Sequence, residues 1–138
     1  RSDPSFGTDR LASGILDFGN GLQASFTCST QVAPYQRINI LGTQGRVEID
    51  IPFNAPPDRP CRVSLYPGTH SDQGRFEPAE SQVLDMDICD QYTLQGEAIS
   101  LAILNDEPVP YRLEDAVGNM RTLEALRQSN ESSTWIVP

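Results

Sequence analysis

Three polar side chains alternate along residues 35–39 and could bind a hydroxyl-rich ligand. Tyr35, Arg37 and Asn39 supply a phenol, a guanidinium and an amide. In an extended strand every second side chain points to the same face, so we expect these three to share one face. Polyhydroxylated substrates need fixed donors and acceptors of this kind. The alternative is a sheet surface that meets only solvent or another subunit.

Few other residues offer chemistry. All ten basic residues are Arg, so the chain cannot supply a Schiff base, a P-loop lysine or lysine acid–base catalysis. Its only histidine, His70, and its three cysteines, Cys28, Cys61 and Cys89, lack the paired short spacings of a zinc site. We therefore predict no metal site. Three cysteines without a CxxC motif favour reduced thiols in a cytoplasmic protein.

The composition narrows the class of partner. A length of 138 residues fits one domain, and the net charge of −9 makes nucleic acid an unsuitable partner, because phosphate binding uses clustered Lys and Arg. No apolar run approaches the roughly 20 residues of a membrane span. The sequence therefore predicts a globular domain that binds neither nucleic acid nor membrane.

The sequence predicts two amphipathic helices within residues 90–129. Their apolar faces need a surface to pack on, and the strands that precede them are expected to supply it. Asp90 is the expected N-cap of the first helix, and Pro108 lies past its end. The second helix should begin after Pro110, carry acidic residues in its first turn and stop at Asn130 in left-handed geometry. Apolar residues recur on one face of each helix and are expected to be buried; those of the second helix are Ala116, Val117, Met120, Leu123 and Leu126. Tyr92 and Gln95 are interpreted as part of the packed helix motif and not as ligand contacts.

The first two thirds of the chain predict strands and turns. Residues 11–18 and 22–30 flank an Asn-Gly turn, and residues 35–41 and 46–51 flank a second turn, which indicates two hairpins. Further short strands are expected at 62–66 and 82–86, with a mobile polar loop at 68–78. The predicted fold class is α+β, a two-layer α/β arrangement. It consists of a mostly antiparallel or mixed sheet of five to six strands, with two C-terminal helices on one face and an open, polar opposite face.

Several of these segments resemble one known family. They are DQYTLQGEA at residues 90–98, PVP at 108–110, LEDAVGNMR at 113–121, FGNGL at 18–22 and ILGTQGRVEI at 40–49. Together they are similar to the C-terminal domain of the glucose-fructose oxidoreductase and inositol dehydrogenase (Gfo/Idh/MocA) family, over about residues 11–137.

The resemblance implies a specific domain organisation. Residues 1–10 would be a linker from a missing N-terminal Rossmann domain that holds NAD or NADP, and residues 11–138 a C-terminal substrate and oligomerisation domain. The parent protein would transfer a hydride to or from a sugar, polyol or related compound. This domain would form pocket walls, with Tyr35, Arg37 and Asn39 as substrate-binding candidates, and a dimer or tetramer interface through its open sheet face.

The family's catalytic and cofactor motifs have no counterpart in this chain. A glycine-rich strand–turn–helix fingerprint, a Glu-Lys-Pro lysine and an Asp-x-x-x-His pair are all absent from the sequence. We therefore predict no catalytic and no cofactor-binding residue here, and an inactive fragment. The alternative hypothesis is a non-catalytic binding or scaffolding module of the same fold.

Overall fold

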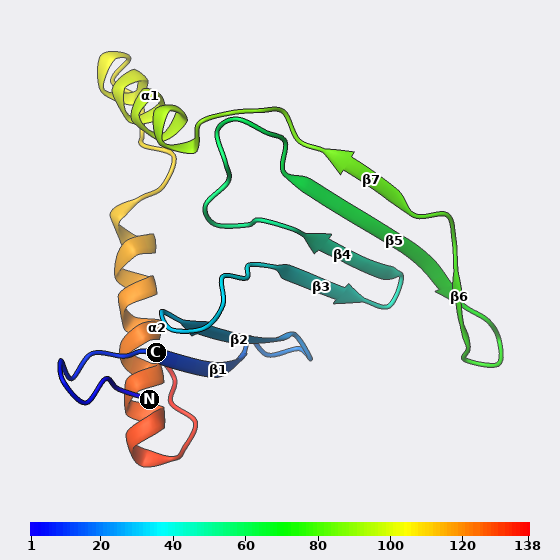
Figure 1. Cartoon of the computed structure of the whole chain (residues 1–138), viewed down its shortest axis with the longest axis horizontal. Coiled ribbons are helices and arrows are strands. Elements are labelled where there is room, and N and C mark those ends of the chain that lie inside the picture. The colour runs from blue at the N-terminus through cyan, green and yellow to red at the C-terminus, as the bar shows by residue number, and fades with distance from the viewer. The chain divides into compact units, whose positions relative to one another are not determined.

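The computed structural model describes residues 1–138, which divide into two compact units. Unit 1 comprises Arg1–Pro34 and Tyr111–Pro138, and unit 2 comprises Tyr35–Pro110. Unit 1 holds strands β1 (Leu11–Asp17) and β2 (Gln23–Ser29) and helix α2 (Leu113–Ser132), and unit 2 holds the remaining elements (Figure 1).

The hairpin of β1 and β2 forms as the sequence predicts. The strands pair antiparallel, with Gly14 opposite Phe26. Their turn contains Asn20 at φ 53° between Gly19 at φ 77° and Gly21 at φ 79°. Asn and Gly are the residues that adopt this left-handed backbone most readily, which is why the turn occurs here.

Gly14 is where α2 meets the hairpin. A Cβ atom at Gly14 would lie 2.7 Å from Cε1 of Phe26 and 3.1 Å from Cδ2 of Leu126 in α2. The absent side chain therefore lets the Phe26 ring cross over the neighbouring strand and lets Leu126 approach it. Ala125, on the same helix, is buried.

Helix α2 begins where the sequence predicts but ends later. Glu114 and Asp115 occupy its first turn, where carboxylates favour the positive end of the helix dipole. The prediction that Asn130 stops the helix was wrong, since the helix continues to Ser132 and Ser133 takes the left-handed conformation (φ 56°, ψ 36°). Hydroxyls of Ser129 and Ser132 bond to main-chain carbonyls of Thr134 and Gln128, so the Ser-rich end is held by local hydrogen bonds.

Unit 2 contains a five-stranded antiparallel sheet. Strands β3 (Ile38–Gly42), β4 (Gly45–Ile49) and β5 (Arg62–His70) lie side by side (Figure 1). The far edge of β5 pairs with both β7 (Gln82–Asp85) and β6 (Phe76–Pro78). One face carries Ile40, Val47 and Leu65 around a shallow groove of about 420 Å³.

The sequence suggested a loop over residues 68–78, but parts of this polar stretch form strands. Strand β5 continues to His70, and β6 pairs with it through Gly68, Thr69 and His70. The ring of His70 packs edge-on against Phe76, with centroids 5.4 Å apart. Ala79 to Ser81 separate β6 from β7, so the edge of β5 is covered by one interrupted strand. This accounts for seven strands where five to six were expected; the α+β class is confirmed.

Helix α1 (Gln91–Leu104) is capped at both ends. Asp90 accepts a hydrogen bond from the Tyr92 N–H at 3.0 Å, which confirms it as the N-cap. At the other end the Glu107 N–H reaches the Ala102 carbonyl at 2.9 Å and Asp106 has φ 56°, which is a Schellman ending with Asp in the usual glycine position.

Both helices keep most of their apolar side chains exposed. Ala102 and Ala125 are the buried apolar residues, whereas Met120 is 58% and Tyr92 68% exposed. The expectation that Met120 and Tyr92 are packed inside was wrong for this chain. Periodicity identifies an apolar face but not what covers it. Neither helix combines the length and the continuous apolar character that a membrane-spanning segment requires.

Candidate functional site

The polar face of the β3–β4–β5 sheet carries two of the three predicted substrate-binding residues, Arg37 and Asn39, with partners from two further strands. Asn39 lies opposite Glu48, which lies opposite Ser64 on β5. Alternation places every second residue on this side. We call this surface the charged face; its members are Arg37, Asn39, Leu41, Arg46, Glu48, Asp50, Arg62, Ser64 and Tyr66.

Ion pairs fix the two arginines nearest to β3. Arg37 donates to Glu48 Oε2 from Nη1 at 3.2 Å and lies 2.9 Å from Asp50 Oδ1 through Nη2. Arg46 Nε donates to the other oxygen of Glu48 at 3.0 Å. Glu48 is therefore held between two guanidinium groups, and its side chain is only 18% exposed. Arg37 is already neutralised, so this face does not present a free positive charge to a ligand.

An aromatic ring completes the cluster. The guanidinium carbon of Arg46 lies 3.9 Å from the centroid of the Tyr66 ring, which is a cation–π contact. Ser64, beside Glu48, is 7% exposed and is the buried polar residue of the chain. Arg46, Glu48 and Tyr66 were not singled out from the sequence as site residues. The signal for the first two was their alternation across the Gly42–Gly45 turn from Asn39 and Leu41.

Tyr35 stands apart from this cluster. Its side chain is 77% exposed and precedes β3. The neighbouring Gln36 turns toward the loop after β4, where its Oε1 accepts from the N–H groups of Phe53 and Asn54 at 3.3 and 3.4 Å. The structure thus brings Arg37 and Asn39 together around Glu48 and leaves the Tyr35 phenol at the entrance of the strand.

A small hollow adjoins the charged face at the ends of β4 and β5. It has a volume of about 240 Å³ and is lined by two arginines, two aspartates and three less polar residues. Asp50, which pairs with Arg37, lines it, and so do Arg62 and Asp85, whose side chains pair at 3.2 Å. The hollow extends the same paired-charge chemistry to the edge of the sheet.

The remaining reactive residues are not members of the charged face, although Cys61 lines the adjoining hollow. His70 is engaged with Phe76, and the Cys61 thiol lies 3.9 Å from the Ile51 carbonyl as a weak donor. All three cysteines are free thiols. No group of three or more His, Cys, Asp or Glu side chains is arranged to hold a metal ion.

The helix N-termini do not fit a dinucleotide. Such cofactors place their pyrophosphate on the exposed N–H groups of a helix start. In α1 those groups already serve the Asp90 carboxylate, whose pKa is lowered by the Thr93 hydroxyl and then by the Tyr92 N–H. In α2, Glu114 and Asp115 occupy the first turn and would repel phosphate. Both helix starts therefore already have carboxylates beside their N–H groups.

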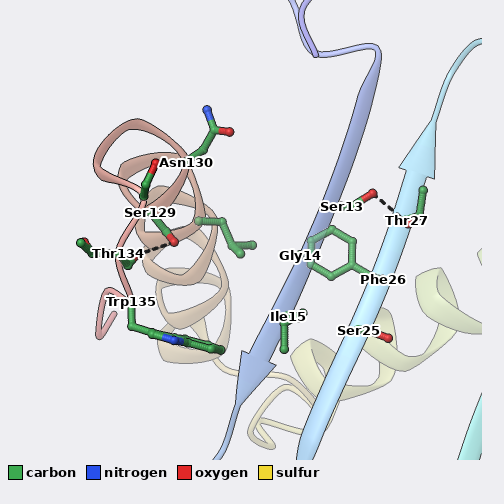
Figure 2. Close-up of a pocket in the computed structure, with 12 residues that line it drawn as sticks. Ser13, Gly14, Ile15, Ser25, Phe26, Thr27, Ser129, Asn130, Thr134 and Trp135 are labelled. Atoms are coloured by element: carbon green, nitrogen blue, oxygen red, sulfur yellow. Dashed lines mark hydrogen bonds between the residues drawn. The ribbon is translucent and has the colours of Figure 1, made fainter.

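Unit 1 contains an open groove of about 730 Å³. Figure 2 shows Ser13, Gly14 and Ile15 of β1 on one side and Asn130, Thr134 and Trp135 at the end of α2 on the other. No charged side chain lines the groove. Ser13 and Thr27 bond to each other across the hairpin at 2.9 Å, so their hydroxyls are already paired.

The structure is that of an α+β domain whose larger sheet carries paired charges on one face. A family profile described as the C-terminal alpha/beta domain of an oxidoreductase family (Gfo/Idh/MocA) matches residues 1–137. The chain belongs to this family. The resemblance noted in the sequence is thereby confirmed.

Two curated relatives agree with this assignment. An uncharacterized oxidoreductase, ORF334, of Rhizobium meliloti is 38% identical over 133 residues, which cover 96% of this chain and 38% of the relative. D-xylose 1-dehydrogenase (NADP(+)) 2 of Haloferax volcanii is 27% identical over 135 residues, which cover 94% of this chain and 37% of the relative. The chain thus spans less than two fifths of the length of these relatives. No solved structure matches it.

Proposed function

We propose that this chain is the C-terminal domain of a longer NAD(P)-dependent oxidoreductase that acts on a sugar, polyol or related hydroxyl or carbonyl compound. The observation that carries the proposal is the family match over residues 1–137 in a chain that spans less than two fifths of its relatives. The name of the Haloferax volcanii relative, a xylose dehydrogenase that uses NADP, supports the sugar class and the cofactor.

The charged face supplies one wall of the substrate pocket in this proposal. Arg37 and Asn39 present donors in orientations fixed by Glu48 and by strand pairing, and Tyr35 adds a hydroxyl at the strand entrance. Because the arginine charges are balanced by carboxylates, the wall suits neutral hydroxyl groups better than phosphates. NAD or NADP, bound by another part of the longer protein, would supply the hydride chemistry.

The same face also suits contact between subunits. It alternates arginines and carboxylates and carries Leu41, which is 77% exposed. In a two-fold dimer the same patch meets itself, so a surface that contains both charges can be self-complementary. We propose a homodimer or tetramer built through this face. The three free thiols fit a reducing, cytoplasmic location.

Assay of the full-length protein tests the proposal. Purified protein is incubated with NAD or NADP and a panel of aldoses and polyols, and reduced nicotinamide is followed by absorbance. We expect turnover with at least one neutral sugar or polyol, and none from the 138-residue chain alone. Sugar binding without nicotinamide binding or turnover would contradict the oxidoreductase proposal and favour the binding-module alternative.

A further inference from the structure

The outer edge of β1 has unpaired backbone groups. Antiparallel strands exchange hydrogen bonds at every second residue. The Thr30 N–H donates to the Arg10 carbonyl at 3.2 Å and the Phe18 N–H to the Leu22 carbonyl at 3.0 Å, so the even-numbered residues of β1 bond to β2. Ser13 and Ile15 therefore direct their N–H and C=O groups to the opposite side, where no backbone partner is present.

The first residue of the chain already occupies one position along this edge. The Arg1 nitrogen donates to the Leu11 carbonyl at 2.6 Å, and the Leu11 N–H donates back to the Arg1 carbonyl at 3.3 Å. This reciprocal exchange is the signature of an antiparallel strand pair. The Arg10 N–H also reaches the Arg1 carbonyl, at 3.0 Å, which makes a β-bulge of the two residues opposite Arg1.

Residues 2–9 form the reversal that such a pair requires. Ser2 and Asp9 make an antiparallel bridge. The Asp3 N–H donates to the Thr8 carbonyl at 2.7 Å, and the Gly7 N–H donates to the Asp3 carbonyl at 2.8 Å. The segment is thus the closed loop of a hairpin whose second strand is β1 and whose first strand is represented by Arg1 and Ser2.

The groove in unit 1 borders this edge and also extends over the hairpin to Ser25, Phe26 and Thr27 of β2. Ser13 and Ile15, which carry the unpaired backbone groups, line it together with Thr134 and Trp135 (Figure 2). Trp135 is 68% exposed there. Paired strands lie about 4.8 Å apart, so a groove of about 730 Å³ beside an open edge has room for an added strand. With no charged side chain around it, the groove suits an uncharged or apolar segment.

We propose that the free edge of β1 binds an extended segment antiparallel to β1, and that this segment is the stretch preceding Arg1 in the full-length protein. Continuing the Arg1–Leu11 pairing, the residue two positions before Arg1 pairs with Ser13 and the residue four positions before it pairs with Ile15. The inference rests on the proposed function only in taking the chain as part of a longer protein. A second copy of β1 is the competing occupant.

Amide hydrogen exchange measured by NMR on the full-length protein tests this pairing. We expect the Ser13 and Ile15 amides to exchange as slowly as those of Gly14 and Leu16, which are bonded to β2. In the 138-residue chain the Ser13 and Ile15 amides should exchange roughly tenfold or more faster than their neighbours. Fast exchange of Ser13 and Ile15 in the full-length protein would overturn the proposal.

A pair of proline variants sharpens the test. Proline two positions before Arg1 removes an N–H that bonds to Ser13 and should speed exchange at Ser13. Proline immediately before Arg1 removes an N–H that points away from β1 and serves as the matched control. Equal effects of the two variants would contradict the register. Protection that rises with the concentration of the 138-residue chain would identify a second copy as the occupant. Neither readout depends on oxidoreductase activity, so failure here is distinct from failure of the proposed function.

Discussion

Arg37 is more constrained than a surface arginine usually is. Two carboxylates, Glu48 and Asp50, hold its guanidinium from different directions, and its side chain is 34% exposed. Exposed ion pairs contribute only about 0–1 kcal/mol each to stability. The value of this arrangement is therefore orientation, because the donors that remain on Arg37 are held in a fixed plane.

Tyr35 offers the simplest test of the substrate wall. In the full-length enzyme, Tyr35→Ala should lower kcat/KM for the best sugar roughly tenfold, because one hydroxyl partner of the sugar is lost. Tyr111→Ala is a matched control, since Tyr111 is 83% exposed between the two helices and belongs to no proposed site. Unchanged steady-state kinetics for Tyr35→Ala would remove Tyr35 from the pocket.

Asp90 gives a prediction about pH. The carboxylate caps α1, and its pKa is lowered from the ordinary value of 3.8, first by the Thr93 hydroxyl and then by the Tyr92 N–H. Its stabilising effect is therefore complete above the unfolded pKa and is lost as pH falls through the lower folded pKa. We expect Asp90→Ala to lower the urea midpoint at neutral pH and to have little effect in strong acid.

Asp90→Asn is the matched control for the charge. The amide oxygen can still accept from Tyr92, so this variant should unfold at a midpoint between those of the wild type and Asp90→Ala. A difference between wild type and Asp90→Ala that stayed constant from neutral to acid pH would contradict the assigned role.

The sequence predicted which residue types share this sheet face, but it did not predict the ion pairs between them. Tyr35, Arg37 and Asn39 were grouped because alternation alone fixes which side chains share a face. That Glu48 would bridge two arginines depends on the register between β3 and β4, which the Gly42–Gly45 turn sets and which composition does not reveal. Whether these residues contact a substrate stays a prediction.

At the scale of elements, the glycines in β5 and α1 should respond in opposite ways to the same substitution. A Cβ at Gly68 would collide with the Phe76 ring and lie 2.7 Å from the Glu77 carbonyl oxygen, whereas a Cβ at Gly96 would meet nothing within 4 Å. We expect Gly68→Ala to destabilise the chain by about 1–3 kcal/mol. Gly96→Ala should stabilise it by about 0.5–1 kcal/mol, because Ala favours helix over Gly. Urea denaturation measures both, and a stabilising Gly68→Ala would contradict the pairing of β5 with β6.

That pairing also shows where sequence patterns failed for elements. Both hairpins and both helices were predicted because an Asn-Gly turn, a second glycine-containing turn, proline boundaries and an aspartate cap act locally. Strand β6 was overlooked because its three residues are too short to show alternation and lie among polar residues. Its formation depends on a long-range partner, the extension of β5 to His70.

At the scale of the whole molecule, the proposed subunit contact through the charged face is testable by mass. Leu41 is 77% exposed on that face. Leu41→Asp replaces an exposed apolar side chain there with a strongly hydrated carboxylate and should weaken the dimer of the full-length protein roughly tenfold or more in sedimentation. Leu104→Asp, at the end of α1 where Leu104 is 79% exposed, is the matched control. If Leu41→Asp left the sedimenting mass unchanged, the interface would lie elsewhere.

The apolar faces of α1 and α2 also show what sequence patterns leave undetermined at this scale. Periodicity correctly identified apolar stripes on both helices, yet Leu123 is 53% and Ile99 45% exposed in the chain. Apolar periodicity identifies a helix face that favours burial, but it does not identify the residues that bury it. Those residues can lie outside this chain. The α+β class could be predicted from local signals, whereas the depth of the core could not.

The turn between β1 and β2 contains a site where slow deamidation is expected. Asn20 and Gly21 both hold left-handed backbones at the hairpin tip, and the Gly21 N–H has no backbone partner. That nitrogen is free to attack the Asn20 side-chain carbonyl, releasing ammonia and leaving aspartate or isoaspartate after hydrolysis. Stored protein should therefore acquire negative charge at this one turn, detectable by isoelectric focusing, and Asn20→Gly should keep the hairpin while preventing this ageing.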